Sequence, residues 1–199
     1  MCVPAGSSAS ERTAAKGEPA VFLDRDGVLT RAVMVDGKPY PAKSLEEAVL
    51  LPGVEAACRA LREAGLPLIC VTNQPDISRG TLSSHAVARI NSWLLETLGL
   101  TDIRTCPHDD RDDCECRKPR PGLLCAAAAD HGLNLSASVM VGDRWRDMMA
   151  AHNAGCIGVF IDYGYDEPQP AHVHYRFPSL RAAIPTILRL TAHRSVRHS

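Results

Sequence analysis

Short, nearly apolar runs alternate with longer amphipathic stretches along most of the chain. A short apolar run bounded by polar or turn-forming residues predicts a strand that is buried on both faces. Runs that fit this description occupy residues 20–23, 66–71, 138–142 and 157–162, and residues 103–106 (IRTC) are a further candidate strand. The pattern therefore predicts several short buried strands that are spread along the whole chain.

Between these runs, apolar residues recur at the three- and four-residue spacing of a helix. Val87, Ile90, Leu94 and Leu98 show this spacing clearly, and Pro or Gly residues mark several predicted helix ends. Helices are expected at residues 51–65, 83–98, 121–132, 146–155 and 179–190, the last despite Pro185. Alternating strands and helices predict an α/β fold, a Rossmann-like and mostly parallel sheet with helices on both faces.

The length of 199 residues suits one domain with a sizeable core. We predict a single domain over residues 19–190, a flexible N-terminal extension over 1–18 and a flexible basic tail over 191–199. The extension is small and polar and lacks the apolar segment of a signal peptide. No apolar run reaches the length of a membrane span, so a cytoplasmic protein is expected.

The overall charge argues against nucleic acid as a partner. The formal net charge is −1, which gives no general attraction to a polyanion. We therefore expect a protein that binds neither nucleic acid nor membrane, and a monomer is the default expectation. Cys58, Cys70, Cys125 and Cys156 lie in apolar segments and are expected to be reduced core residues.

Two aspartates follow the first predicted strand, in the stretch FLDRDGVLT (22–30). Carboxylates as close as those of Asp24 and Asp26 repel each other unless a cation neutralises them. Mg²⁺ prefers oxygen ligands of this kind. One carboxylate could then attack an electrophile while the other transfers protons. For an isolated pair, the alternative is a solvated Asp-Arg-Asp turn.

Polar side chains also follow two further predicted strands. Thr72, Asn73 and Gln74 end the second run and could donate hydrogen bonds to phosphate oxygens, whereas Asp143 follows the fourth run and Asp147 lies four residues later. Each feature alone has an ordinary structural explanation, such as a turn or a helix N-cap. In parallel sheets, however, ligands bind beyond the carboxyl ends of the strands, so these residues are expected to lie together.

The stretch CPHDDRDDCECRKP (106–119) is the densest group of metal-ligand residues in the chain. Cys106, His108, Cys114 and Cys116 can surround one Zn²⁺ tetrahedrally, and four protein ligands predict a structural zinc rather than a catalytic one. A disulfide is the alternative, but three cysteines leave one unpaired and no secretion signal is evident. The four aspartates of the loop are interpreted as a solvated acidic face.

The order of these elements is more specific than any one of them. A strand followed by DxDG, a strand followed by TN, an Arg-Lys pair and a strand followed by GDxxxD occur in succession on one α/β chain. In this order they resemble the haloacid dehalogenase superfamily of phosphotransferases, over roughly residues 20–165. The resemblance implies an enzyme, a phosphatase that acts through an aspartyl-phosphate.

The resemblance also implies a role for each matching residue. Asp24 would be the nucleophile, and Asp26 the general acid and then the general base. Mg²⁺ would be held by Asp24, Asp143 and the backbone carbonyl of Asp26, with Asp147 a secondary candidate. The residues expected to bind and neutralise the phosphoryl group are Thr72, Asn73, Gln74, Arg117 and Lys118.

The zinc-type loop narrows the resemblance to one branch, which contains the heptose 1,7-bisphosphate phosphatases and the histidinol-phosphate phosphatases. Two departures from the heptose group are Arg144, where a lysine is frequent, and the long loop at 31–49. The spans between motifs are too short for an inserted cap domain. A capless fold would select its substrate with loops 31–43 and 74–80 and the zinc loop, where Lys38 and Arg79 could meet a second phosphate.

The expected function is Mg²⁺-dependent hydrolysis of a phosphate monoester of a small metabolite. A sugar bisphosphate is preferred as substrate, with D-glycero-D-manno-heptose 1,7-bisphosphate converted to heptose 1-phosphate, because the site region is rich in arginine. Histidinol phosphate is the alternative substrate. A DNA-end phosphatase lacks the basic surface it would need, and the intact acidic motifs argue against a non-catalytic, zinc-stabilised binding module.

Overall fold

The computed structural model describes residues 17–35 and 38–195, except the side chains of Val35, Lys38 and residues 193–195. The predicted extension over 1–18 therefore lies almost wholly outside the described residues, as do the last four residues of the predicted tail. The suggested role of the Lys38 side chain lies outside them too. In the described ranges, no helix combines the length and apolar character that a membrane span needs.

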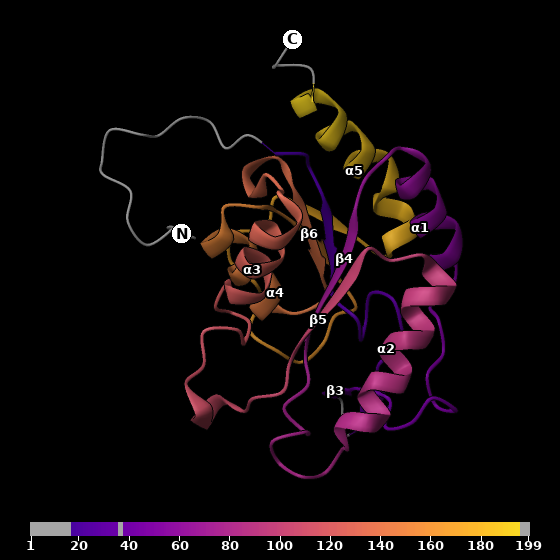
Figure 1. Ribbon diagram of the computed structural model, residues 1–199, viewed down its shortest axis with the longest axis vertical. Coiled ribbons are helices and arrows are strands. Elements are labelled where there is room, and N and C mark those ends of the chain that lie inside the picture. The colour runs from indigo at the N-terminus through magenta and orange to yellow at the C-terminus, as the bar shows by residue number, and fades with distance from the viewer. Residues whose placement is uncertain (1–16, 36–37, 196–199) are drawn as a thin grey trace.

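A six-stranded sheet forms the centre of the described structure (Figure 1), and every pairing in it is parallel. The strand order is β5-β4-β1-β6-β7-β8. In chain order the strands are β1 (Val21–Leu23), β4 (Leu68–Asn73), β5 (Asp102–Cys106), β6 (Val139–Gly142), β7 (Ile157–Ile161) and β8 (Tyr175–Phe177). The predicted parallel α/β sheet is confirmed.

Helices cover both faces of the sheet (Figure 1). One face packs against α1, α2 and α5, and the other packs against α3 and α4. The helices are α1 (Val54–Glu63), α2 (Ser84–Leu98), α3 (Gly122–His131), α4 (Trp145–Ala154) and α5 (Leu180–Ser195), and the short 3₁₀ turns are η1 (Asp110–Asp112) and η2 (Leu135–Ala137). The five predicted helices are all present.

The four central strands β1, β4, β6 and β7 are largely apolar because each one is buried on both faces, whereas the edge strands β5 and β8 are mostly half-buried. Val21 and Leu23 of β1 join the core beneath α1, α2 and α5, whereas Phe22 points to the core beneath α3 and α4. All three side chains are fully buried. This two-sided burial explains why short apolar runs, rather than alternating patterns, identified the strands.

Three features differ from the sequence-based prediction. The predicted loop after the first strand contains an antiparallel hairpin, β2 (Val33–Val35) and β3 (Lys38–Tyr40). The edge strand β8 was not predicted, because its three residues form no apolar run. Helix α5 continues past residue 190 to Ser195, so the predicted end of the domain was placed too early. Thr191 is buried there, and its hydroxyl donates a hydrogen bond to the Ile187 carbonyl.

The cysteines outside the metal-type loop are mostly core residues, as predicted. Cys58, Cys70 and Cys156 are buried free thiols. Burial raises the pKa of Cys156 to about 12, which makes this thiol unreactive. Cys125 differs, because it is only partly buried on α3 and is disulfide-bonded, so the expectation of a reduced core thiol is wrong for this residue.

Candidate active site

The ends of three neighbouring strands bring the predicted acidic and polar residues together. Strand β1 lies between β4 and β6 in the parallel sheet, so the residues that follow all three strands meet at one edge. Asp24 follows β1, Thr72 and Asn73 end β4, and Asp143 follows β6. The backbone N–H of Asp24 donates to the Val141 carbonyl at 2.9 Å, which fixes the start of the loop after β1.

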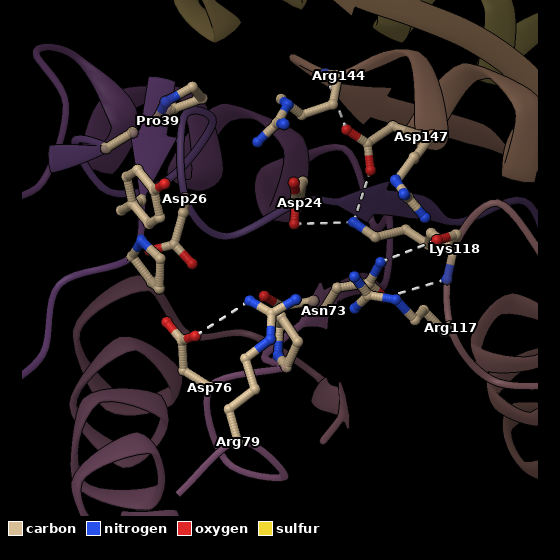
Figure 2. Close-up of a pocket in the computed structure, with 16 residues that line it drawn as sticks. Asp24, Asp26, Pro39, Asn73, Asp76, Arg79, Arg117, Lys118, Arg144 and Asp147 are labelled. Carbon is tan, nitrogen blue, oxygen red and sulfur yellow. Dashed lines mark hydrogen bonds and ion pairs between the residues drawn. The ribbon is translucent and has the colours of Figure 1, made fainter. Parts of the chain in front are cut away.

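Lys118 forms the electrostatic centre of this edge. Its Nζ lies 2.9 Å from Asp24 Oδ1 and 2.6 Å from Asp147 Oδ1 (Figure 2). It also donates to the Val71 carbonyl at 2.8 Å. All three ammonium donors are therefore used, which is what a buried ammonium requires. Burial lowers the pKa of Lys118, but the carboxylates of Asp147 and Asp24 outweigh it and hold the pKa above its usual range.

Asn73 holds the backbone of Lys118 in place. The Asn73 side-chain amide donates to the Lys118 carbonyl at 3.0 Å, and its oxygen accepts from the Lys118 N–H at 3.1 Å. Asn73 was expected to bind phosphate, and it does line the cavity, but both ends of its amide are occupied here. In this structure its side chain positions the lysine.

Three carboxylates beside Lys118 form a candidate metal centre. Asp24, Asp143 and Asp147 each place one oxygen within 4.8 Å of the others. Burial, together with the charge of Asp147, raises the pKa of Asp24 to about 7, although Lys118 opposes this shift. Burial, together with the charges of Asp24 and Asp147, raises the pKa of Asp143 well above its usual value. Crowded, buried carboxylates of this kind are stabilised by a bound cation.

Asp143 is particularly well suited to be a metal ligand. Both of its carboxylate oxygens are buried, and among the described residues neither accepts a hydrogen bond of ordinary geometry. A buried charge without a partner costs several kcal/mol, whereas coordination to Mg²⁺ would satisfy it. Asp147, which the sequence marked only as secondary, is buried beside it and accepts a hydrogen bond from the Arg144 N–H at 3.0 Å.

Asp26 is held by a separate set of donors. Its Oδ2 accepts from Arg25 Nε at 3.0 Å and from Gln74 Nε2 at 2.8 Å, and its Oδ1 accepts from the Thr30 hydroxyl at 3.1 Å. Gln74 was expected to contact substrate, but its side chain is fully buried, does not line the cavity and also bonds Thr72. The sequence did not identify Arg25 or Thr30 as part of the site.

A cavity of about 250 Å³ opens above these residues. Arginine side chains from several segments line it, as Figure 2 shows for three of them, and the hairpin supplies an apolar wall. The lining arginines are Arg79, Arg117, Arg144 and Arg146, and the wall residues are Ala32, Pro39, Tyr40 and Pro41. The cavity therefore combines a cationic face with an apolar one.

The acidic loop residues hold several of these arginines. Arg79 forms a two-pronged contact with Asp109, with Nε and a terminal nitrogen 2.9 and 2.7 Å from its two oxygens. Asp110 Oδ1 lies 2.8 Å from Arg117 Nε and 3.0 Å from a terminal nitrogen of Arg146. Asp109 and Asp110 are not part of the Cys/His cluster, and Asp110 is exposed, but both carboxylates also form ion pairs with arginines that line the cavity.

The Cys/His loop forms a second candidate metal centre. Cys116 Sγ lies 3.3 Å from Cys106 Sγ, 3.5 Å from Cys114 Sγ and 3.3 Å from His108 Nδ1. Cys106 Sγ lies 3.7 Å from Cys114 Sγ and 3.6 Å from His108 Nδ1. These separations exceed a disulfide bond of about 2.05 Å. The structure thus brings together all four predicted ligands around one small space.

Comparisons with known proteins agree with this geometry. Residues 40–155 match the family model described as haloacid dehalogenase-like hydrolase. A D-glycero-D-manno-heptose-1,7-bisphosphate 7-phosphatase from Thermosynechococcus vestitus is 38% identical over 165 residues, 75% of this chain and 81% of that protein. The corresponding β-anomer enzyme from Yersinia pestis is 38% identical over 146 residues, 67% and 74% of the two chains.

Solved structures show the same relationship. The D,D-heptose 1,7-bisphosphate phosphatase from B. bronchiseptica, crystallised with magnesium and phosphate, superposes with a TM-score of 0.75 and 28% identity, covering 86% of this chain and 98% of that one. A putative HAD-like phosphatase from Mesorhizobium loti gives a TM-score of 0.71 with 31% identity, and the match covers 88% of each chain.

We predict that Gly27→Ala impairs the acidic metal centre. A Cβ at Gly27 would overlap the Asp143 carboxylate, and its φ of +95° is strained for any other residue. The variant should lose most of the thermal stabilisation that Mg²⁺ gives the protein, measured by differential scanning fluorimetry across a Mg²⁺ titration.

Gly155→Ala is the matched control, because its φ is +78° and a Cβ there would meet nothing within 4 Å. It carries similar backbone strain, of about 1–2 kcal/mol, away from the carboxylates. A Gly27→Ala protein that responds to Mg²⁺ like Gly155→Ala would contradict the placement of the metal at Asp143.

Proposed function

Because the chain belongs to the haloacid dehalogenase-like hydrolase family, we propose that it is a Mg²⁺-dependent phosphatase acting on D-glycero-D-manno-heptose 1,7-bisphosphate, with heptose 1-phosphate as product. The observation that carries the proposal is the contact of Lys118 with Asp24 beside a buried acidic cluster, beneath an arginine-lined cavity. The relatives from Thermosynechococcus vestitus and Yersinia pestis, which are named as heptose-1,7-bisphosphate 7-phosphatases, support the proposal.

Mg²⁺ would be held by Asp24, Asp143 and the backbone carbonyl of Asp26. The crowding of buried carboxylates supports this assignment, as does the absence, within the described part of the chain, of a well-formed hydrogen bond to Asp143. When bound, the ion neutralises negative charge so that an anionic nucleophile can approach an anionic phosphate. Asp147 is better explained as the partner that keeps Lys118 charged and aimed at the reacting group.

The chain's own residues perform the transfer in two steps. An oxygen of Asp24 bonds to phosphorus while the bond from phosphorus to the sugar oxygen breaks, and Asp26 gives its proton to that leaving oxygen. Asp26 then takes a proton from water as the water oxygen attacks phosphorus, which frees Asp24 and releases inorganic phosphate. Lys118 stabilises the negative charge of the phosphoryl group in both steps. Thr72 lines the cavity at the same strand edge.

The arginines at the cavity mouth support a substrate with two phosphates. The reacting phosphate occupies the carboxylate and lysine end, and a distal anion would meet Arg79, Arg117 and Arg146, whose partners in this structure are Asp109 and Asp110. Arginine binds phosphate bidentately and remains charged at all physiological pH values. Histidinol phosphate, with a single phosphate and a cationic amine, would place a positive charge in or near this arginine-rich region. The electrostatics therefore favour the sugar bisphosphate.

We assign the Cys/His cluster to one structural Zn²⁺. A tetrahedral zinc separates its sulfur and nitrogen ligands by about 3.5 to 3.8 Å, close to the observed 3.3 to 3.7 Å. Three thiolates and one imidazole leave no position for water, so the role is structural. The three thiols of this site are free, which favours a cytoplasmic location even though Cys125 is disulfide-bonded. A monomer remains the simplest proposal for the assembly.

We predict that Asp24→Asn abolishes turnover with Mg²⁺, by about 10⁴-fold or more, because an amide cannot form the proposed aspartyl-phosphate. Phosphate release and acid-trapped ³²P-labelled protein would both be measured. Glu63→Gln, a change at the end of α1, should leave both signals unchanged. Full turnover by the Asp24→Asn protein would remove Asp24 from the reaction.

We predict that Arg146→Gln weakens binding of the bisphosphate selectively. Loss of one charge-assisted contact, worth about 1.5–3 kcal/mol, should raise KM by roughly ten- to hundredfold for heptose 1,7-bisphosphate and hardly change it for heptose 7-phosphate. Arg59→Gln, an exposed arginine of α1, is the matched control. An equal effect on both sugars would contradict a distal phosphate site at Arg146.

We predict that purified protein contains about one zinc per chain, and that changing Cys114 and Cys116 together to Ser removes it. The variant should also bind substrate less tightly, because Asp110 and Arg117 lie in or beside the same loop. Metal analysis by mass spectrometry gives the stoichiometry. Cys58→Ser, a core cysteine outside the cluster, should retain zinc, and equal zinc in all three proteins would exclude this site.

A further inference from the structure

Arg25 is a fully buried charged residue between the two aspartates of the DxD motif, and its relative exposure is 0%. A buried guanidinium is costly unless its donors are paired. Its position between Asp24 and Asp26 suggests that it serves the site rather than the core. The contacts of its side chain identify which group it serves.

The Arg25 side chain connects the general acid to the surrounding scaffold. Its Nε and one terminal nitrogen each lie 3.0 Å from Asp26 Oδ2. The other terminal nitrogen donates to Asn91 Oδ1 of α2 at 3.1 Å, and Asn91 Nδ2 donates to the Thr105 hydroxyl of β5 at 3.0 Å. Asp26 is therefore tied through Arg25 to a helix and a strand that are distant in sequence.

The two oxygens of Asp26 are not equivalent in this network. Oδ2 accepts from both Arg25 and Gln74 Nε2, which fills the two lone-pair positions of that oxygen. Oδ1 accepts only from the Thr30 hydroxyl, and that single proton can instead be donated to the Arg25 carbonyl at 3.2 Å. Oδ1 is therefore the oxygen with capacity for a further proton or hydrogen bond.

We propose that Arg25 is a positioning residue that fixes Asp26 so that Oδ1 is the oxygen that gives and takes the catalytic proton. The inference rests on the proposed function and assigns a residue to its proton-transfer step. In the first step the proton on Oδ1 passes to the leaving sugar oxygen as the phosphorus–oxygen bond breaks. In the second step Oδ1 takes a proton from the attacking water, so protons balance over the cycle.

The effect of losing Arg25 should depend on the leaving group of the substrate. A sugar alkoxide is a poor leaving group and needs the proton, whereas p-nitrophenolate leaves readily without it. If Arg25 acts by positioning the acid, its loss should slow formation of the aspartyl-phosphate from the sugar substrate and spare formation from p-nitrophenyl phosphate. Hydrolysis of the aspartyl-phosphate needs Asp26 as a base and should be slow in both cases.

Rapid-quench and stopped-flow measurements on Arg25→Met with Mg²⁺ test this directly. With p-nitrophenyl phosphate we expect a burst of about one nitrophenolate per chain at nearly the unaltered rate, followed by turnover that is slower by ten- to hundredfold. With heptose 1,7-bisphosphate the first turnover itself should be slower by ten- to hundredfold. Arg62→Met, an exposed arginine of α1, should change neither reaction.

Two further variants keep the test decisive if Arg25→Met fails to fold. Thr30→Val removes the donor to Oδ1 with little change of shape. It should also slow the first turnover with the sugar substrate and not with p-nitrophenyl phosphate, but by a smaller factor. Arg25→Lys keeps the charge with fewer donors and should be intermediate. Equal slowing of the first turnover for both substrates, in the folded variants, would overturn the inference. Absence of turnover in the unaltered protein would instead contradict the phosphatase function.

Discussion

The site depends on one buried ammonium group, that of Lys118, placed between Asp24 and Asp147. The carboxylates of Asp24 and Asp143, which follow neighbouring strands, and of Asp147 in α4 could not remain charged together without it, because burial and mutual repulsion favour protonation. The lysine supplies one positive charge, and the remaining negative charge creates the place for a divalent cation. The same ammonium then faces the phosphoryl group, so one residue both stabilises the folded site and takes part in its chemistry.

Strand β4 and the Cys/His loop together place the lysine. Asn73, at the end of β4, holds the backbone of Lys118, and the Val71 carbonyl accepts from its ammonium. The Cys/His cluster ends just before Lys118 in the chain, so a metal bound there restrains the loop that delivers it. Asp110, in the same loop, forms ion pairs with Arg117 and Arg146 and so holds these two side chains in place. The loop therefore links metal binding, lysine placement and the cationic face of the cavity.

Much of the fold and the metal ligands could be predicted from the sequence because they leave strong local signals. Buried parallel strands are short apolar runs, and Cys106, His108, Cys114 and Cys116 have recognisable spacing. The hairpin and β8 leave no such signal, because Val33, Met34 and Tyr40 of the hairpin are exposed and no residue of β8 is fully buried. Their existence depends on pairing partners that are set by the tertiary structure.

The residues that hold other side chains of the site in position were the hardest to predict. Arg25 and Gln74 are buried polar side chains whose partner, Asp26, is fixed only once β1 and β4 lie side by side. Nothing in a local sequence window separates such residues from solvated surface groups. The same holds for Asp109 and Asp110, which look like a solvated acidic run until the arginines they hold are seen.

The most direct test of the account is substrate selectivity in phosphate release with Mg²⁺. Both anomers of D-glycero-D-manno-heptose 1,7-bisphosphate and histidinol phosphate would be compared at equal concentration. The account predicts a kcat/KM at least about a hundredfold higher for one heptose anomer than for histidinol phosphate, which corresponds to about 2.7 kcal/mol of transition-state discrimination. A preference for histidinol phosphate, or equal activity with and without Mg²⁺, would contradict it.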